Sequence, residues 1–240
     1  VVRNDIPLYV LYAHPQTRPQ GQKAGGRLPR PAFFHLQGYG KFWDRFLQST
    51  SNLLQGFGEM NESIGLLLKA FRFSAEKHSD QRRKDSKSSP YINHPIQVAE
   101  TLWAIGDVRD VTLLIASILH DTIEDTGTRP DEIKAEFGED VLALVLEVTD
   151  DKSLPKQVRK QLQVEMAHHK TRNAKLLKLA DKICNVRDII ATPPSNWSLQ
   201  RKQEYLLWTE QVVAGLRGVN EKLERYYDDL LAEGKRALGI

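Results

Sequence analysis

A histidine and three carboxylates lie close together at residues 120–125, which read His-Asp-Thr-Ile-Glu-Asp. This run directly follows an apolar stretch at residues 111–119, so its polar side chains are expected at the end of a buried segment. Desolvating several charged groups without partners is costly. A cluster of this kind is therefore typical of a site that coordinates a cation or moves protons.

A divalent metal ion needs three or more ligands that converge from separate elements, and four residues are candidates: His94, His120, Asp121 and Asp181. Two imidazoles and two carboxylates suit a first-row ion such as Mn²⁺, Fe²⁺ or Zn²⁺. Such an ion can lower the pKa of a bound water to about 7, which makes a nucleophile at neutral pH. An adjacent His-Asp pair is common by chance, so the distant His94 and Asp181 are what favour a metal site.

Two further acids follow the His-Asp pair at helical spacing. Glu124 lies four residues after His120, and Asp125 lies four residues after Asp121. Residues four apart share one face of a helix. Glu124 and Asp125 are therefore predicted to lie near the metal without binding it, where one could orient or deprotonate water and the other could handle a leaving-group proton. By the same spacing, Asn185 shares the helix face of Asp181.

The elements that must position these residues are predicted to be helices, and the fold class is all-α. From residue 60 onward apolar residues recur at helical spacing, and no stretch alternates as a β-strand does. The predicted helices are 64–75, 95–105, 111–119, a short one from 130, 141–148, 156–168, 172–190 and one or two over 198–231. Asp110 is predicted to cap the third helix, and a polar loop at 85–90 ends at a proline.

Residues 1–59 differ from the rest of the chain. They contain five of the 11 prolines and seven of the 15 glycines, and their net charge is +4 against −1 for the remainder. Only a short amphipathic piece at 42–54 is helical in pattern. We expect 1–59 to be a low-order extension and 60–240 to be the functional domain. Since Met60 is the first methionine, translation is hypothesised to start at or near it.

Composition excludes several classes of protein. The basic pI arises from the N-terminal quarter, so nucleic acid is not an expected partner. No stretch reaches the ~20 apolar residues of a membrane span, and no secretory signal is evident. The single cysteine, Cys184, excludes a disulfide framework and a cysteine-based zinc site. These features predict a protein of a reducing compartment, the cytoplasm, without a membrane partner.

Over residues 67–229 the sequence resembles the His-Asp (HD) hydrolase domain of the RelA/SpoT alarmone enzymes. It is most similar to the small stand-alone hydrolases known as metazoan SpoT homologues. Six segments carry the resemblance, in this order: Gln81-Arg82-Arg83-Lys84, Pro90-Tyr91-Ile92-Asn93-His94-Pro95, His120-Asp121-Thr122-Ile123-Glu124-Asp125-Thr126, Glu147-Val148-Thr149-Asp150-Asp151-Lys152, Lys178-Leu179-Ala180-Asp181-Lys182 with Asn185, and Gln203-Glu204-Tyr205.

The resemblance implies an HD-domain helical bundle with a single central Mn²⁺ site. It implies hydrolysis of the 3′-pyrophosphate of guanosine tetra- or pentaphosphate to GDP or GTP and pyrophosphate, the step that degrades the alarmone of the stringent response. Matched by position, the metal ligands are His94, His120, Asp121 and Asp181, and the catalytic acids are Glu124 and Asp125. The matched substrate-binding residues are Arg83, Lys84, Asn185, Arg201 and Tyr205.

The chain departs from the family pattern in the loop before Pro90, where the family usually has a glycine and this sequence has none at 85–89. Two other functions stay open. Stand-alone members of the family are also associated with removal of the 2′-phosphate of NADPH, and a catalytically silent nucleotide sensor would use the same residues. Apolar surface left over on 198–231 could also pair subunits into a homo-oligomer.

Overall fold

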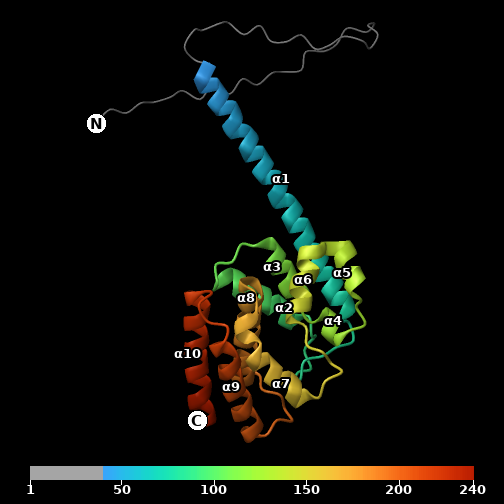
Figure 1. Ribbon diagram of the computed structural model, residues 1–240, viewed down its shortest axis with the longest axis vertical. Coiled ribbons are helices and arrows are strands. Elements are labelled where there is room, and N and C mark those ends of the chain that lie inside the picture. Colours follow the sequence, from blue (N-terminus) through green and yellow to red (C-terminus); the bar gives the residue numbers. More distant parts are fainter. Residues whose placement is uncertain (1–39) are drawn as a thin grey trace, which may run out of the picture. The chain divides into compact units, whose positions relative to one another are not determined.

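The computed structural model describes residues 40–240, without the side chains of residues 40, 42 and 43, and this part of the chain is all-α (Figure 1). It contains no strand, and its one isolated β-bridge pairs Arg82 with Pro90. The helices are α1 (Gly40–Lys77), α2 (Asn93–Ala104), α3 (Val111–Leu119), α4 (Thr122–Asp125), α5 (Pro130–Phe137), α6 (Glu139–Val148), α7 (Lys156–Glu165), the 3₁₀ turn η1 (Ala167–His169), α8 (Arg172–Ala191), α9 (Leu199–Ala214) and α10 (Glu221–Leu238). The prediction of an all-α fold is confirmed.

Most of the predicted N-terminal extension, residues 1–39, lies outside the described residues. The rest of it lies in α1, which begins at Gly40 and continues without a break through Met60. Gly56 and Gly58 lower helix propensity but do not forbid helical backbone. The chain divides into two units between residues 49 and 50. The domain boundary at residue 60 stays a prediction, and no helix end marks it.

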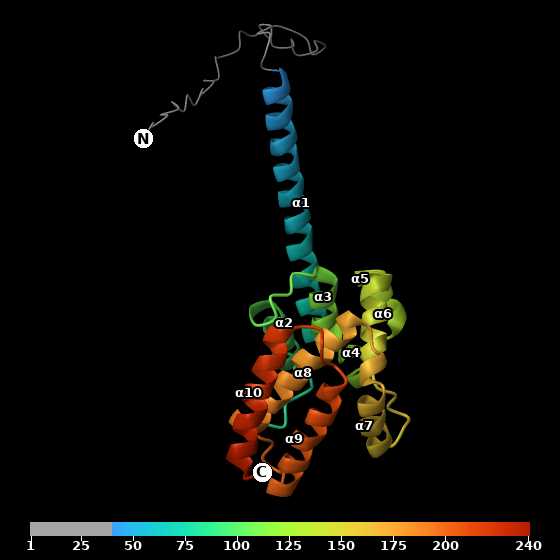
Figure 2. The ribbon, with the colours of Figure 1, turned by 60° about the vertical axis from the view of Figure 1, so that its left-hand side comes forward.

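Within residues 50–240, helix α8 is the central element of the bundle. It packs against α2, α3, α6, α9 and α10, and in both views it lies inside the bundle with α9 and α10 on one side (Figures 1 and 2). Its residues from Leu176 to Cys184 are all buried. Because α8 is buried almost all round, its polar residues Asp181 and Lys182 must find partners inside the protein.

The helices that lead into the site start and stop at recognisable signals. The Asp110 carboxylate accepts a hydrogen bond from the backbone N of Leu113 at 3.1 Å, which confirms the predicted cap of α3. Helix α3 is apolar along its whole length and ends at Leu119, so His120 and Asp121 emerge at its buried end. The single turn α4 then carries Glu124 and Asp125.

The loop before α2 forms a tight turn without the glycine that the resemblance leads one to expect there. Ser88 takes the left-handed conformation, with φ of 49°. The Asp85 carboxylate accepts hydrogen bonds from the backbone N atoms of Lys87 at 2.9 Å and Ser89 at 3.2 Å. Asp side chains stabilise tight turns in this way. The loop is therefore held without a glycine, at the conformational cost of one non-glycine residue in the left-handed region.

The region 198–231 forms two helices, the second of the two alternatives left open by the sequence. Ser198 caps α9 and Asn220 caps α10, each accepting from backbone N atoms of the following turn. Tyr227 on α10 is fully buried, and its hydroxyl donates to Thr209 of α9 at 3.0 Å. Among the described residues, no helix combines the length and apolarity needed to cross a bilayer.

Candidate active site

Three helices bring a buried cluster of potential metal ligands together. His94 lies in the first turn of α2, His120 follows the last residue of α3, and Asp181 lies near the middle of α8. One ligand atom from each lies within 4.8 Å of the others, and all three residues are buried. His94 Nε2 is 3.1 Å from Asp181 Oδ1. Residues 87 positions apart thus meet inside the bundle.

The fourth predicted ligand, Asp121, lies at the edge of this cluster. Its Oδ2 is 3.1 Å from His120 Nε2 and 3.9 Å from His94 Nε2. The Tyr91 hydroxyl donates to the same Oδ2 at 2.7 Å. All four predicted ligands are therefore neighbours, and Tyr91, which was not among the predicted site residues, is hydrogen-bonded to one of them.

The orientation of His120 fits a metal ligand. In the neutral form of the ring, Nδ1 donates to the backbone carbonyl of Ser117 at 2.8 Å, and the lone pair is then on Nε2. Nε2 is buried and lies 3.1 Å from Asp121 Oδ2 without a hydrogen bond to it. Ligating histidines are commonly held by such a bond from the other ring nitrogen. The donor set therefore fits a divalent ion.

The charges of the cluster also favour a cation. Burial opposes the charged form of His120, but the carboxylates of Asp121 and Asp181 outweigh it and raise the pKa of His120 to about 9. Burial likewise opposes ionisation of Asp181, yet the ammonium group of Lys182 and the hydrogen bond from His94 hold its pKa well below the usual range. Two carboxylates kept ionised inside a protein require compensating positive charge.

Asp181 is fixed by residues of its own helix. Asn185 Nδ2 donates to Oδ1 at 2.6 Å, and Lys182 Nζ donates to Oδ2 at 3.0 Å. Lys182 Nζ in turn lies 4.7 Å from the centroid of the Trp208 ring on α9. Asn185, predicted as a substrate residue, is thus also a hydrogen-bond partner of a predicted metal ligand.

Glu124 lies beside the cluster and is held by the segment that follows α6. Its Oε2 accepts from the backbone N of Asp150 at 3.0 Å, while Lys152 Nζ and Arg159 Nη1 lie 3.5 and 3.7 Å from its Oε1. Burial raises the pKa of Glu124 above its ordinary value. A carboxyl group with a raised pKa and a fixed position is suited to exchange protons.

Asp125, the second predicted acid, has a different set of hydrogen-bond partners. Its Oδ1 accepts from Lys152 Nζ at 2.5 Å, and its Oδ2 accepts from Gln81 Nε2 at 3.3 Å. Lys152 therefore lies between the two predicted catalytic acids. The sequence did not single out Lys152, because one lysine in a polar turn carries no signal of its own.

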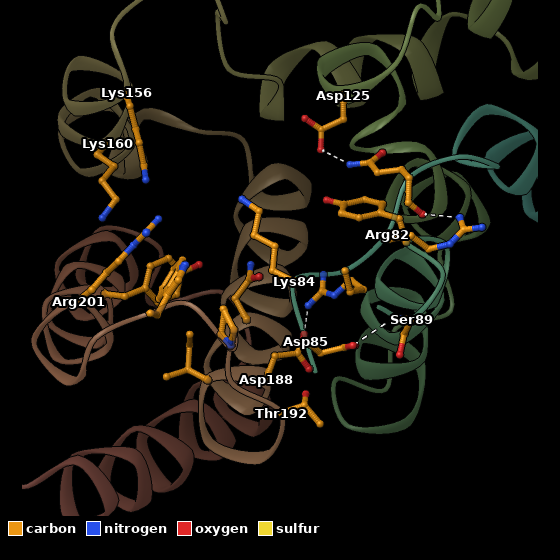
Figure 3. Close-up of a pocket in the computed structure, with 18 of the residues that line it drawn as sticks. Arg82, Lys84, Asp85, Ser89, Asp125, Lys156, Lys160, Asp188, Thr192 and Arg201 are labelled. Carbon is orange, nitrogen blue, oxygen red and sulfur yellow. Dashed lines mark hydrogen bonds and ion pairs between the residues drawn. The ribbon is translucent and has the colours of Figure 1, made fainter. Parts of the chain in front are cut away.

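Two hollow spaces lie at the candidate site: a cleft of about 930 Å³ (Figure 3) and a smaller cavity of about 250 Å³ that includes part of the cluster in its lining. The cleft is lined by both predicted acids and by every predicted substrate-binding residue: Arg83, Lys84, Glu124, Asp125, Asn185, Arg201 and Tyr205. The smaller cavity contains the predicted metal ligands His94, Asp121 and Asp181. The two spaces share lining residues such as Glu124 and Asn185, so one ligand could reach both.

On one wall of the cleft, Arg83 is held by partners from two elements. Its Nη2 forms an ion pair with Asp188 Oδ2 on α8, and its guanidinium carbon lies 5.8 Å from the centroid of the Tyr91 ring. Both charged side chains are mostly buried. Asp188 was not among the predicted site residues, since an acid seven residues after Asp181 has no evident partner in the sequence.

The opposite wall carries a row of positive charge, of which only Arg201 was predicted from the sequence. Lys156 and Lys160 extend from α7 toward the cleft, with Arg201 of α9 nearby (Figure 3). Their spacing of four residues places the two lysines on one helix face. That spacing was a usable signal, but a lysine stripe on a polar helix is more often a solvated surface.

Comparison with known proteins identifies the family. Residues 70–210 match the model of the HD domain family, and they include every predicted site residue. The chain is 51% identical to guanosine-3′,5′-bis(diphosphate) 3′-pyrophosphohydrolase MESH1 of Xenopus tropicalis over 72% of this chain and 97% of that protein. It is 52% identical to the human MESH1 protein over 69% of this chain and 92% of that protein.

Structural comparison agrees. A solved structure of a metazoan ortholog of SpoT, described as hydrolysing ppGpp and acting in starvation responses, superposes with a TM-score of 0.69. The two sequences are 42% identical, and the match covers 70% of this chain and 94% of that chain. The chain therefore belongs to the HD-domain family, within the RelA/SpoT-type group that includes the MESH1 proteins.

Proposed function

We propose that this chain hydrolyses guanosine 3′,5′-bis(diphosphate) at the 3′ position, giving GDP and pyrophosphate, with the pentaphosphate yielding GTP. The observation that carries the proposal is the buried cluster of His94, His120 and Asp181 beside a small cavity that shares lining residues with a cleft with basic walls. Two relatives that are 51% and 52% identical to this chain are named as enzymes with that activity.

A divalent ion is assigned to the cluster, with His94, His120, Asp121 and Asp181 as its ligands. We propose Mn²⁺, because a mixed set of imidazole and carboxylate donors suits a first-row ion of intermediate hardness. When bound, such an ion supplies positive charge to the phosphate oxygens and makes water more acidic. Tyr91 and Ser117 support this role by fixing the Asp121 carboxylate and the His120 ring.

The reaction adds water to the phosphorus atom attached to the ribose O3′. The P–O3′ bond breaks, O3′ takes up a proton, and the water oxygen remains on the released pyrophosphate. Glu124, whose burial raises its pKa, is assigned to the attacking water. Asp125 is assigned to the proton that O3′ receives, since Lys152 and Gln81 hold its carboxylate at the cleft. Positioned acids and bases of this kind typically accelerate reactions by about 10²–10⁴-fold.

The nucleotide is assigned to the wider cleft. Arg83 presents a flat guanidinium group that can stack on a base, and it already lies near the Tyr91 ring. Lys84 and Arg201 carry positive charge suited to phosphate groups. Tyr205 offers an aromatic surface next to Trp197, with ring centroids 5.4 Å apart. Arg83 and Lys84 come from the loop before α2, whereas Arg201 and Tyr205 come from α9, so the cleft selects a ligand that spans the two.

A product assay tests the proposal. Full-length protein is incubated with guanosine tetraphosphate, with and without Mn²⁺, and the nucleotides are separated by chromatography. The expected result is GDP and pyrophosphate in equal amounts, with little turnover after metal removal. A preference for NADPH in kcat/KM would assign the 2′-phosphatase function instead. Tight binding of the tetraphosphate without turnover in any divalent metal would make the protein a nucleotide sensor.

The cellular compartment and the oligomeric state are further parts of this proposal. We assign the enzyme to the cytoplasm, because one buried cysteine is in keeping with a reducing compartment. Self-association through residues 198–231 is a further proposal, for which Leu199 and Leu207 are exposed apolar residues. Light scattering of the purified protein gives the oligomeric state directly.

A further inference from the structure

The smaller cavity is lined both by predicted metal ligands and by residues of α7, and much of its lining is basic. Besides the predicted ligands, it is lined by five positively charged side chains: Lys156, Arg159, Lys160, Lys178 and Lys182. A catalytic water and a single phosphate need only the metal and its two neighbouring acids. The additional positive charge therefore calls for a ligand with more negative charge than one phosphate carries.

Three of these cations already have partners inside the protein. Lys182 Nζ donates to Asp181 at 3.0 Å, Lys178 Nζ donates to the Val148 carbonyl at 3.1 Å, and Arg159 lies 3.7 Å from Glu124. Each is accounted for by a neighbouring oxygen atom. They contribute to the local potential but are not free to bind an anion directly.

Lys156 and Lys160 differ, because neither ammonium group forms an ion pair with any of the described residues. Lys160 Nζ lies over two aromatic rings, 4.5 Å from the centroid of Trp208 and 5.5 Å from that of Tyr205. Lys182 Nζ lies over the same indole at 4.7 Å. Glu204 is the acid that acts on Lys160, from beyond ion-pair distance.

The electrostatic environment of these two lysines is unfavourable without a ligand. Burial, the neighbouring Lys156 and Lys182, and Arg201 lower the pKa of Lys160. Burial, Arg201 and Lys84 lower the pKa of Lys156 in the same way. An anion that binds between such lysines offsets the repulsion between their positive charges and stabilises their charged forms.

We infer that Lys160, assisted by Lys156, binds the second phosphate of a ribose-linked diphosphate whose first phosphate lies at the metal cluster. This inference rests on the proposed function and deepens it. The cavity would thereby select a diphosphate over a monophosphate on the ribose. It would also retain inorganic pyrophosphate after the reaction, so pyrophosphate should be a competitive product inhibitor and orthophosphate a poor one.

Direct binding tests the inference without turnover. Full-length protein loaded with Mn²⁺ and freed of excess metal is titrated with pyrophosphate and with orthophosphate in a calorimeter. The Lys160→Met variant keeps the apolar stem that packs on Trp208 and removes only the charge. Loss of a charge-assisted hydrogen bond should weaken pyrophosphate binding by about 10- to 100-fold, with orthophosphate changed by less than about threefold. The matched control is Lys222→Met, an exposed lysine on α10, which should bind both anions as the parent does.

A second readout uses selectivity. Lys160→Met should lower kcat/KM for guanosine tetraphosphate by about 10-fold or more, while kcat/KM for the monophosphate substrate NADPH changes by less than about threefold. Metal content and melting temperature identify a folding failure, in which case Lys160→Gln replaces the variant. Equal affinity of the parent for the two anions, or unchanged pyrophosphate binding in Lys160→Met, overturns the inference. Absence of tetraphosphate turnover in a parent that still binds pyrophosphate through Lys160 overturns the proposed function alone.

Discussion

The buried His/Asp cluster and the outer cleft hold their side chains in different ways. His94, His120 and Asp181 project from three packed helices, and each is buried and fixed by short contacts. The outer cleft is made of long charged side chains, such as Arg83 and Lys160, that come from a loop and from the half-exposed α7. A rigid inner site costs no reorganisation when the reaction occurs, whereas the outer side chains can exchange one partner for another.

That difference separates two kinds of effect. Changes at the inner end should reduce kcat or abolish metal binding, because the geometry cannot adjust. Changes in the outer cleft should act mainly through KM, since a missing contact to the nucleotide removes binding energy that is shared by the ground and transition states. The following predictions test this separation, in order of decreasing effect.

Asp181→Asn should have the largest effect. It removes a charge from the proposed metal site, so bound Mn²⁺ should be lost and kcat/KM should fall by about 10³-fold or more. Metal analysis and a turnover assay measure both. The matched control is Asp131→Asn on the surface of α5, which should keep metal and activity. Full metal occupancy in Asp181→Asn would remove Asp181 from the ligand set.

Glu124→Gln should keep the metal and lose the rate. The amide preserves the shape and the hydrogen bond from Asp150 but cannot take up a proton, so kcat should fall by about 10²–10⁴-fold. Steady-state kinetics together with metal analysis separate this result from loss of the ion. Hydrolysis at the parent rate would exclude Glu124 as the proton acceptor.

Arg83→Gln should act mainly on KM. Loss of a charged hydrogen-bonding group that is proposed to contact the nucleotide should raise KM by about 10- to 100-fold with a smaller change in kcat. The neighbouring Arg82→Gln is the control, because the Arg82 side chain donates to backbone carbonyls of Ser79 and Gln81. A fall in kcat alone in Arg83→Gln would mean that Arg83 acts like the residues of the buried cluster, which contradicts the expected separation of kcat and KM effects.

Thr171→Ala should give the smallest effect. The Thr171 hydroxyl oxygen caps α8 by accepting from the backbone N of Ala174 at 3.3 Å, and its O–H donates to Glu147. Removing the cap should lower the free energy of unfolding by about 1 kcal/mol. Denaturant unfolding measures this value. KM should not change, and a marked change would mean that the N-terminus of α8 is coupled to the cleft.

Helix positions were predictable where local signals are strong. Asp110 accepts from a backbone N at the start of α3, and Pro130 occupies the first turn of α5, so these ends depend on residues within one turn. The prediction was weaker for α1, for which the sequence indicated only the separate helical pieces 42–54 and 64–75, and for 198–231, where one long helix and two helices have the same periodicity. Propensity is a weak prior that packing can override.

The candidate site also contains residues that could be predicted from the sequence and residues that could not. The candidate metal ligands and the two candidate acids could be singled out from the sequence, because several polar groups beside an apolar run have few purely structural explanations. The partners Tyr91, Lys152, Asp188 and Lys160 were not predicted, because each is a common residue whose role depends on a neighbour far away in sequence. Ser88 also required the structure, since its left-handed backbone is set by the turn around Asp85.

The sequence by itself thus determined an all-α protein and, through its motifs, the residues that could hold a metal and move protons. Helix periodicity and end signals are local, so they can be read along the chain. Only the tertiary structure decided that one nitrogen of His120 is left without a hydrogen bond, that Arg83 pairs with Asp188, and that Lys160 lies over Trp208 without an acid. These properties depend on burial and on distances between separate helices, and the packing of α8 against its neighbours sets both.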